Sequence, residues 1–504
     1  MNKLFFFFCC LQILPSYSQV EQTGRWEIGM TEEDTETYNV ASDSLGLIVY
    51  SKLYGKLHDQ IELIRLDTSL QEKWKGYISI DPGLNVVRTT VRKNLLYLLL
   101  RNPRFTGFLL IELNITTGKY TTHIINNIIP FIPTEFAGTN GAVMIGGYYN
   151  YRPLVLHYSF NLQKSKILPG FFNEPGELTQ MKVSENGAID IIVSAKNFDK
   201  QKNLWIRNYS AEGELLKTTV LESREKRNLI FGRSIKMPNN EQVVAGVYGK
   251  NTEYSRGIFI ATINPFGEYT IRYYNFADLQ NFFHYLKANQ ERRIKNRIER
   301  RRIKGKNTKF NYRLLVQELI SYRDQFIMLG EAFYPHYIYK SRNNSNPFFT
   351  SNNARGNLYY SPYNNDYVFD GYQYTHAIVI GFDTSGKVKW DNSFEINDVR
   401  SFKLEQFVKI AAADEHVDLL YLFENLIRTK VIQNNEVLEG KSVDELKIFS
   451  DQGVITKEDA KSNHLDYWYD HHLYASGVQT IRKSKDKREI PFKKVFFINK
   501  IKYK

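Results

Sequence analysis

The chain has 504 residues, of which 42% are hydrophobic and 14% aromatic, so it is long and apolar enough for a large core and does not fit an intrinsically disordered protein. Its formal net charge is +13, and most of this charge comes from one segment, so the rest of the chain is nearly balanced. After residue 14, no stretch approaches the roughly 18 apolar residues of a membrane-spanning helix, and we expect no transmembrane segment.

The N-terminus predicts an export signal over residues 1–18. A lysine precedes an apolar run over residues 4–14, a proline breaks the run, and a small-x-small cleavage site ends at residue 18. The alternative is a short buried strand. The two cysteines, Cys9 and Cys10, lie in the signal, so the mature chain would form no disulfide. We expect an exported protein that is periplasmic, associated with the outer membrane or extracellular.

An alternating apolar strand followed by an Asn-, Asp- or Ser-led turn returns eight times along the chain. The turns lie at Asp67, Asn114, Asn161, Ser210, Asn264, Asp383, Ser450 and Asn499. Five of the seven steps between them measure 47 to 54 residues, which is the length of one four-stranded propeller blade. One strand pair cannot bury its apolar face alone, and ring closure leaves only short protected edges. The sequence therefore predicts an all-β fold, an eight-bladed β-propeller, as a single domain over residues 19–504.

Closure of the ring is predicted from the two chain ends. The last repeat leaves no chain for an outer strand, while residues 24–28 resemble the outer strands of earlier repeats. We therefore expect residues near 22–29 to pair with the C-terminal strand. Seven blades are the alternative if residues 425–449 do not complete a blade.

The stretches GFDTSGKVKWDNSF and LNITTGKYTTHI resemble the repeats of pyrroloquinoline-quinone-type propellers, in which an acidic or Asn residue, a Thr-Gly-Lys turn and a Trp recur in eight blades. The resemblance implies the fold, and the family's non-enzymatic members, including outer-membrane assembly scaffolds, are the closer analogy. The quinone enzymes of that family use a vicinal disulfide at the cofactor. A mature chain without cysteine departs from this pattern, so we expect no cofactor.

Two steps of the repeat are long, and their extra residues form two insertions, 275–311 and 337–374, on the same face of the ring. The first insertion predicts a helix that begins at an Asp278 cap and ends at Gly305. Its apolar residues follow helical spacing in one stripe, at Leu279, Phe282, Phe283 and Leu286.

The second half of this helix is strongly basic. Residues 287–309 contain 11 Lys and Arg against two Glu, a net charge of +9. We predict that it docks on an anionic surface, either acidic lipid headgroups, an acidic glycan or an acidic protein, with Arg300, Arg301 and Arg302 as contact residues. The alternative is a solvated helix packed on the rim. Nucleic acid is disfavoured, because export removes the usual partner and no aromatic side chain interleaves the basic run.

The second insertion is rich in Asn, Ser, Gly and Tyr, a composition typical of binding loops. Tyrosine supplies contact area at low entropic cost, so the predicted contact residues are Tyr359, Tyr360, Tyr363, Tyr367 and Tyr372. The alternative is a long loop with no partner.

One cluster near the C-terminus resembles a metal or catalytic site. The run NHLDYWYDHH contains the weak metal candidates His464, Asp466, Asp470 and His471, and we expect it in the link from blade seven to blade eight, on the insertion face. The alternative is that its aromatic residues pack and its histidines satisfy surface hydrogen bonds. No nucleophile elbow or phosphate-binding loop is present, so no catalytic residue is assigned.

These observations favour an exported propeller that acts as a protein-binding scaffold in a cell-envelope or extracellular complex, through the face that carries both insertions. The alternative is a carbohydrate-binding or glycan-cleaving propeller with its site at the central mouth. Three or more convergent carboxylates at the axis would favour the enzyme, whereas an apolar axis and exposed tyrosines would favour the scaffold.

Overall fold

The computed structural model describes residues 20–30, 38–104, 106–126, 129–139, 141–171, 175–223, 227–237, 239–251, 253–339, 367–413, 415–448, 453–458, 463–483 and 493–503. The predicted export signal lies outside these ranges, as do Tyr359, Tyr360 and Tyr363. Within the ranges given, no helix combines the length and the apolar character needed to cross a bilayer.

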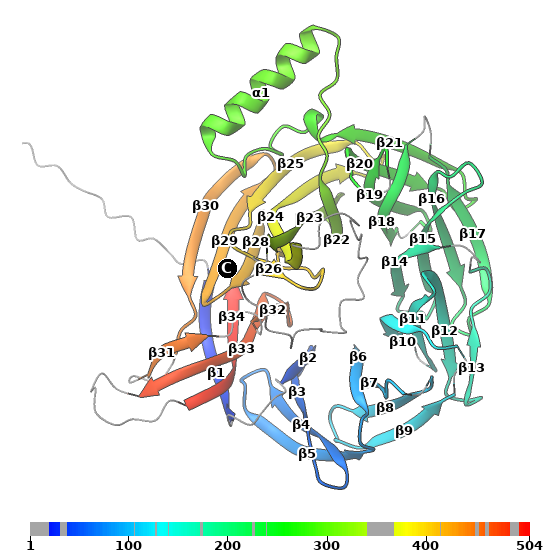
Figure 1. Cartoon of the computed structure of the whole chain (residues 1–504), viewed down its shortest axis with the longest axis vertical. Helices are drawn as coiled ribbons and strands as arrows, with labels where there is room; N and C mark the ends of the chain where they lie inside the picture. Colours follow the sequence, from blue (N-terminus) through cyan, green and yellow to red (C-terminus); the bar gives the residue numbers. More distant parts are fainter. Residues whose placement is uncertain are drawn as a thin grey trace, which may run out of the picture.

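The strands form eight antiparallel sheets arranged as the blades of a ring (Figure 1). Blades one to four are β2 (Asn39–Asp43), β3 (Gly46–Leu53), β4 (Asp59–Asp67) and β5 (Glu72–Ile80); β6 (Asn85–Arg92), β7 (Leu95–Arg101), β8 (Phe108–Asn114) and β9 (Tyr120–Ile125); β10 (Ile132–Gly138), β11 (Ala142–Tyr149), β12 (Arg152–Ser159) and β13 (Lys164–Ile167); and β14 (Gly176–Val183), β15 (Ile189–Lys196), β16 (Lys202–Tyr209) and β17 (Leu215–Leu221). Blades five to seven are β18 (Asn228–Lys236), β19 (Gln242–Gly249), β20 (Gly257–Ile263) and β21 (Tyr269–Asn275); β22 (Arg313–Tyr322), β23 (Gln325–Tyr339), β24 (Tyr367–Asp383) and β25 (Val388–Glu395), with β26 (Arg400–Ser401) beside β24; and β27 (Lys409–Ala412), β28 (Val417–Phe423), β29 (Leu426–Gln433) and β30 (Glu436–Glu445). Blade eight contains β31 (Gly453–Glu458), β32 (His464–Tyr467), β33 (His472–Lys483), β34 (Lys493–Tyr503) and β1 (Val20–Met30).

The core of the molecule lies between the blades. Eight apolar clusters each combine residues from two successive blades, and the last one joins blade eight to blade one. In the cluster between blades one and two, for example, Ile61 and Ile78 pack with Leu98, and all three are buried. Each blade therefore needs both neighbours to bury its two faces, as the repeat pattern predicts.

The predicted turns join the third and outer strands of blades one to six. In these turns the polar side chain at the strand end accepts backbone N–H groups further along, which fixes the turn. The Oδ1 of Asp67 accepts the N–H groups of Ser69 at 2.8 Å and Gln71 at 2.9 Å. The Oδ1 of Asp383 accepts those of Ser385 and Lys387, both at 3.0 Å.

The last two predicted turns are wrong. Asn499 lies inside β34, and Ser450 lies beyond the outer strand of blade seven and outside the described residues. The corresponding turn of blade seven is a two-residue hairpin at Asn434 and Asn435, which is too short to match the longer pattern. Residues 425–449 nevertheless contain β29 and β30, so blade seven is complete and the seven-blade alternative is wrong.

The predicted closure of the ring is confirmed. Strand β1 pairs antiparallel with β34 from Val20 opposite Tyr503 to Met30 opposite Lys494. The Arg25 guanidinium donates to Asn499 Oδ1 at 3.0 Å and to Gln479 Oε1 at 2.8 Å.

A second contact ties the closing strand to blade seven. The Gln22 side chain donates to the carbonyl of Glu445 at 2.7 Å and accepts the N–H of Lys447 at 2.8 Å. It also accepts the Asn499 side-chain amide at 3.0 Å, so β1 holds two blades together.

The predicted helix begins later than expected. Its apolar stripe is not helical: η1 (Phe276–Asp278) is a short 3-10 turn, and α1 (Ala288–Ile303) begins only after Lys287. Phe276, Phe282 and Phe283 are instead buried in the core between blades five and six. The predicted C-terminal stop is confirmed, because Gly305 has a φ of 63° just past the helix end.

Removing residues 20–30 from the mature chain should destabilise the whole ring. The deletion exposes the edge of β34 and removes the Gln22 and Arg25 contacts, which costs several hydrogen bonds at about 1 kcal/mol each in addition to lost packing. We expect the melting temperature to fall by at least about 10 °C and the deleted protein to associate through its open edge. A melting temperature equal to that of the full mature chain would contradict this closure.

Candidate functional site

The longest strands of the propeller form a ribbon that extends from blade six. Strand β22 pairs with β23 only as far as Phe333, and beyond this residue β23 pairs with β24 alone. The pairs from Tyr334 opposite Gln373 to Tyr339 opposite Tyr367 form this two-stranded ribbon. Strand order places it on the same face as the link that contains α1, because both connections leave the ring at the same end of the strands.

The ribbon carries large apolar side chains that remain exposed. Six of them, each between 38% and 56% exposed, form what we call the ribbon patch: Tyr334, Tyr337, Ile338, Val368, Phe402 and Leu404. Half-buried rings support it, since the Phe369 ring centroid lies 5.8 Å from that of Tyr337 and 6.2 Å from that of Phe402. An exposed cluster of this kind, with amphipathic rings, is typical of an interaction surface.

Charged groups border the ribbon patch. Asp370 on β24 forms an ion pair with Arg400 on β26, and its Oδ2 lies 3.2 Å from Nδ1 of His336 on β23. Such a polar rim around apolar residues is the arrangement found in protein interfaces.

None of the predicted tyrosines is a member of the ribbon patch, although two of them, Tyr367 and Tyr372, lie on the same strand β24. Tyr372 is half-buried and packs on Phe333 and Phe369, at ring-centroid distances of 5.5 Å and 5.1 Å. Tyr367 begins β24. Sequence reasoning missed Tyr334, Tyr337 and Phe402. The alternating aromatic residues in AFYPHYIY could have indicated Tyr334 and Tyr337. No local pattern indicates Phe402, because it lies beside the ribbon only through the pairing of β26 with β24.

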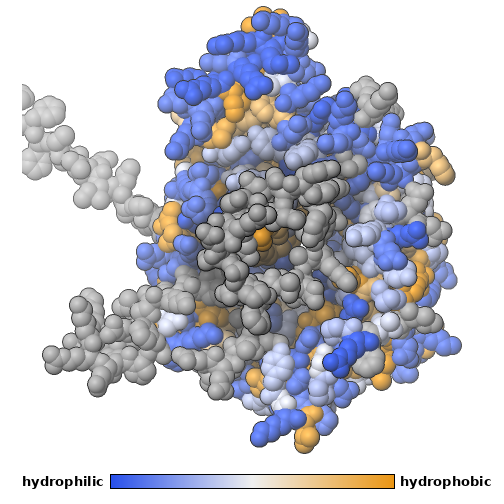
Figure 2. Space-filling model, viewed as in Figure 1, coloured by the Kyte–Doolittle hydropathy of each residue, from blue (hydrophilic) through white to orange (hydrophobic). Residues whose placement is uncertain are grey.

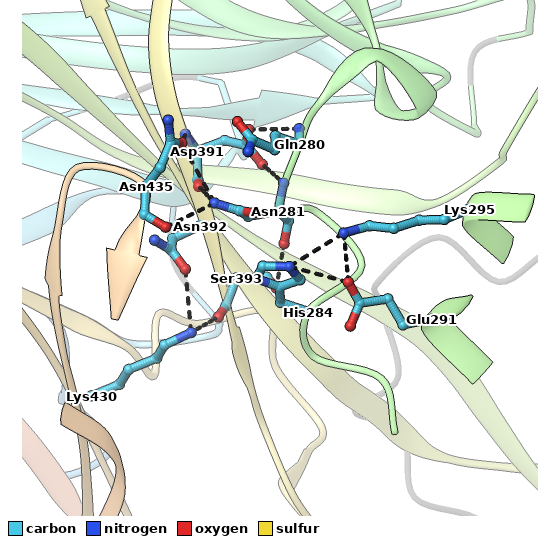
Figure 3. A network of polar contacts seen from close by, with 10 residues as sticks. All are labelled: Gln280, Asn281, His284, Glu291, Lys295, Asp391, Asn392, Ser393, Lys430 and Asn435. Carbon is cyan, nitrogen blue, oxygen red and sulfur yellow. Dashed lines mark hydrogen bonds and ion pairs between the residues drawn. The ribbon is translucent and has the colours of Figure 1, made fainter. Parts of the chain in front are cut away.

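The α1 arm, residues 279–309, is anchored by a network of polar contacts (Figure 3). The buried Asp391 carboxylate on β25 accepts the backbone N–H groups of Gln280 at 2.8 Å and Asn281 at 2.7 Å. The Asn281 side chain donates to the backbone carbonyls of Asp391 and Asn435, and the backbone carbonyl of Asn281 accepts the Ser393 hydroxyl at 3.0 Å. These bonds hold the chain ahead of α1 against blades six and seven, and the helix begins only after this anchored stretch.

The network extends into blade seven and toward the helix. Lys430 on β29 donates to the Ser393 carbonyl at 2.6 Å, and burial lowers the pKa of this ammonium to about 8. On the other side, Glu291 of α1 forms an ion pair with Lys295 at 2.6 Å and contacts His284 at 3.1 Å. The arm is thus fastened to two blades at its base.

The helix itself is solvent-facing and basic. No residue of α1 is buried, and the three predicted contact residues, Arg300, Arg301 and Arg302, are all exposed in its last turn. Figure 2 shows the arm as a largely hydrophilic projection beyond the ring. The basic residues therefore form an exposed surface on α1. The partner that this surface would bind remains a proposal.

The inner strands of the propeller carry a series of bulges, and four of the five residues that follow them are polar. Five successive inner strands, those of blades two to six, carry a β-bulge near the middle or start of the strand. The residues that follow the bulges are Arg88, Glu135, Gln180, Phe231 and Glu318. Bulges re-aim side chains, so this series sets the chemistry of the inner rim.

Side chains of the inner rim also join one blade to the next. Arg88 donates to the Thr134 carbonyl at 3.0 Å, and the Thr179 hydroxyl donates to the Gly232 carbonyl at 3.0 Å. Burial raises the pKa of Glu135, against the opposing attraction of Arg233 and Arg88. The inner rim is therefore polar, which differs from the apolar axis expected for a pure scaffold.

A polar cluster lies where blades six, seven and eight meet. The Tyr467 hydroxyl donates to Glu318 at 3.1 Å and accepts the N–H of Ile410 at 2.6 Å, so one side chain links three blades. Lys409 Nζ lies 2.7 Å from Asp466 Oδ1. Burial raises the pKa of Glu318, with an ionised Asp466 adding to the shift. A cavity of about 230 Å³ opens beside this cluster and is lined by residues that include Gln406, Lys409, His464 and Asp466.

The predicted metal candidates do not converge. His464 and Asp466 lie on β32, the inner strand of blade eight, and not in the link before it. Asp470 and His471 lie in the turn at the other end, which strand order places on the face opposite the insertions. Pairing of β32 with β33 separates the two halves of the motif. Within the described residues, no group of three or more His, Cys, Asp or Glu side chains could hold a metal ion.

Glu331 is a fully buried carboxyl beside this cluster. It accepts the N–H groups of Val408 at 2.7 Å and Phe407 at 3.0 Å and the Gln317 amide at 3.0 Å. It thereby fastens the link between blades six and seven. Burial nevertheless dominates and raises its pKa from 4.5 to about 7.

Comparisons with known proteins identify no family for this chain. No protein-family model matches the sequence, and no curated protein matches it either. The dihydro-heme d1 dehydrogenase NirN is similar in fold, with a TM-score of 0.45 at 10% identity over 95% of this chain and 78% of that one. The Dos1 propeller gives a TM-score of 0.39 at 10% identity, over 83% of this chain and 95% of that one. The polysaccharide lyase Uly1 gives 0.39 at 10% identity, over 83% and 90%.

The eight sheets of the ring define an eight-bladed propeller as the class of this protein. The structure has the eight blades that the resemblance to the quinone-type repeat implies. No family model matches the sequence, so the quinone type of the repeat is not confirmed.

Changing Asp391→Asn should loosen the arm without opening the ring. An amide cannot accept both N–H groups of Gln280 and Asn281, and a buried unsatisfied group costs about 1 to 3 kcal/mol. We expect faster hydrogen exchange over residues 280–303 and unchanged exchange in blades one to four. The exposed Asp398→Asn is the matched control. Equal protection of the arm in both variants would show that Asp391 does not anchor it.

The raised pKa of Glu331 predicts a pH-dependent stability. The unfolded chain releases this proton above pH 4.5, whereas the folded chain keeps it to about pH 7. The folded state is therefore favoured at low pH, and this contribution is lost as the pH rises through 7, by on the order of 3 kcal/mol in total. Denaturant titrations at pH 5 and pH 8 should show a larger loss in wild type than in Glu331→Gln, with the exposed Glu222→Gln as control. Parallel losses in all three proteins would contradict this assignment.

Proposed function

We propose that this protein is an exported β-propeller scaffold that binds a protein partner in a cell-envelope or extracellular complex through the ribbon of blade six. The observation that carries the proposal is the ribbon patch, in which four large apolar side chains stay exposed on the two-stranded ribbon and two more stay exposed in the segment beside it. Single exposed apolar residues are ordinary, but six of them gathered on the two sides of one ribbon and next to it mark an interaction site.

The ribbon is suited to hold a partner because its own geometry is fixed. Tyr337 and Phe369 face each other in register on one side of the ribbon, and Ile338 and Val368 form the next pair on the other side. The strands continue into blade six, so little ordering entropy remains to be lost on binding. Aromatic residues in such positions are the residue types that dominate binding energy in protein interfaces.

The α1 arm supplies a second part of the same surface. It leaves the ring on the same face as the ribbon and carries most of the chain's net positive charge. A partner with an apolar segment next to an acidic one would complement both parts. Exposed charges of this kind mainly steer association, while the aromatic contacts would set the lifetime of the complex.

Capture of partners from the native envelope tests the proposal. We expect the double variant Tyr337→Ser, Phe402→Ser to recover at least tenfold less partner than wild type, because it removes two anchors worth about 1 to 2 kcal/mol each. Phe266→Ser is the matched control, since Phe266 is 88% exposed in a turn on the opposite face. Equal recovery with the patch variant and the control would contradict the proposed site.

Salt separates the two parts of the surface. Neutralising Arg300, Arg301 and Arg302 to Gln should weaken capture of the same partner mainly at low salt, because exposed charges are screened beyond about 10 Å at 0.1 M. The patch variant should weaken capture at every salt concentration. Loss that does not depend on salt in the arginine variant would show that the arm makes close contacts instead.

A second candidate function is binding or cleavage of a carbohydrate at the central mouth. The cavity of about 230 Å³ beside Glu318, Lys409 and Asp466 favours it, because it brings polar groups next to a half-buried carboxyl whose pKa is raised. The carboxylates around Lys409 all have partners, however: Glu318 bonds Tyr467, Asp466 pairs with Lys409, and Glu331 accepts backbone N–H groups. Recovery of a glycan in the capture experiment, unaffected by the patch variant, would favour this second function.

A further inference from the structure

A recess lies at the C-terminal end of α1, separate from the ribbon patch. The chain reverses at Gly305 and runs back beside the helix, so that residues 306–309 face its last two turns. The Lys306 N–H donates to the Arg301 carbonyl at 2.9 Å, and the Arg301 guanidinium donates to the Asn307 carbonyl at 3.3 Å. The recess has a volume of about 430 Å³ and is lined by Arg297, Arg301, Lys306, Asn307, Thr308 and Lys309.

Four of these six residues are cations that have no carboxylate partner in the part of the chain that the structure describes. Among the described residues, the two acidic groups of the helix are already engaged elsewhere, because Glu291 pairs with Lys295 and Glu299 with Arg302. Four like charges around one hollow repel each other, and the repulsion is relieved only by solvent, salt or a bound anion.

Stabilisation of the helix end does not account for this arrangement. Cations often interact with the free carbonyls of a last helical turn. Here the carbonyl of Arg301 already accepts the N–H groups of Lys304 and Lys306, and that of Arg302 accepts the N–H of Gly305. Lys306 and Lys309 also lie beyond the helix end, so they are placed by the returning chain and not by helical periodicity.

A buried hydroxyl provides an independent observation. Thr308 lines the same recess and is only 6% exposed, yet its hydroxyl has no hydrogen-bond partner among the described residues. A buried hydroxyl is normally paired in a folded protein. A hydroxyl beside several cations is a donor set that suits an oxyanion.

We propose that this recess is a binding site for a tetrahedral oxyanion, the phosphate or sulfate group of a larger ligand. The guanidinium groups of Arg297 and Arg301 would bind two oxygens each, the ammonium groups of Lys306 and Lys309 would supply charge, and the Thr308 hydroxyl would donate a further hydrogen bond. A volume of about 430 Å³ leaves room for the group that carries the oxyanion, such as a sugar ring. The site does not depend on the proposed protein partner.

Calorimetric titration of the mature chain with sodium phosphate and sodium sulfate, against chloride at matched ionic strength, tests the proposal. The recess variant is Arg297→Gln, Arg301→Gln, Lys306→Gln, Lys309→Gln. Its matched control is Arg292→Gln, Arg293→Gln, Arg300→Gln, Lys304→Gln, which removes the same four charges from exposed residues of the arm that do not line the recess. We expect the recess variant to lose affinity at least tenfold and the control to stay within about twofold of wild type.

Thr308→Val separates a ligand-binding hydroxyl from a merely buried one. The change keeps the shape and removes the hydroxyl, so we expect the affinity for the oxyanion to fall several-fold while the melting temperature of the ligand-free protein does not fall. Glucose 6-phosphate and glucose 6-sulfate then identify the source of the oxyanion, and tighter binding of either ester than of the free ion supports the site. Equal losses in the recess and control variants, or wild-type binding of phosphate and sulfate no tighter than of chloride, would overturn the proposal.

Discussion

The pairing of β1 with β34 is the interaction on which the rest of the structure depends. Each of the eight apolar clusters lies between two blades, so no blade is buried on both faces until the ring is closed. The closing strand comes from the opposite end of the chain and is held by Gln22 and Arg25, whose side chains bond two strands of blade eight and the end of blade seven. A chain without cysteines after residue 10 therefore secures its ends by a hydrogen-bonded strand instead of a disulfide.

A closed ring also explains why the features that distinguish this protein gather at blade six. The repeated strands are needed for burial and leave little freedom to vary, whereas connections at the strand ends tolerate additions. Blade six carries two such additions. Its inner strand follows the α1 arm, and its two middle strands extend into the ribbon. The network around Asp391 fastens the arm to blades six and seven, so the added elements keep fixed positions relative to the frame.

A structural feature could be predicted from the sequence where the residues that determine it are close together in the chain. It could not be predicted where the partner residue is distant in the sequence. The turns at Asp67 and Asp383 were predictable because each carboxylate binds N–H groups two and four residues further on. The pairing of residues 22–29 with the last strand was also predictable, because a four-stranded repeat leaves one place empty. The start of α1 was not, since the chain ahead of the helix is held by the Asp391 carboxylate, which lies 110 residues away in the sequence. Likewise, Phe402 joins the ribbon patch only through the pairing of β26 with β24.

The bulges of the five inner strands have a consequence for how such a protein can change over time. Each bulge fixes the backbone at the axis by strand pairing, while the side chain that follows it is charged in three blades, amidic in one and aromatic in another. The main chain thus tolerates very different occupants at equivalent places. Side chains around the axis could therefore be substituted one blade at a time. Each substitution would change the charge or polarity of the central mouth and leave the strand pairing intact.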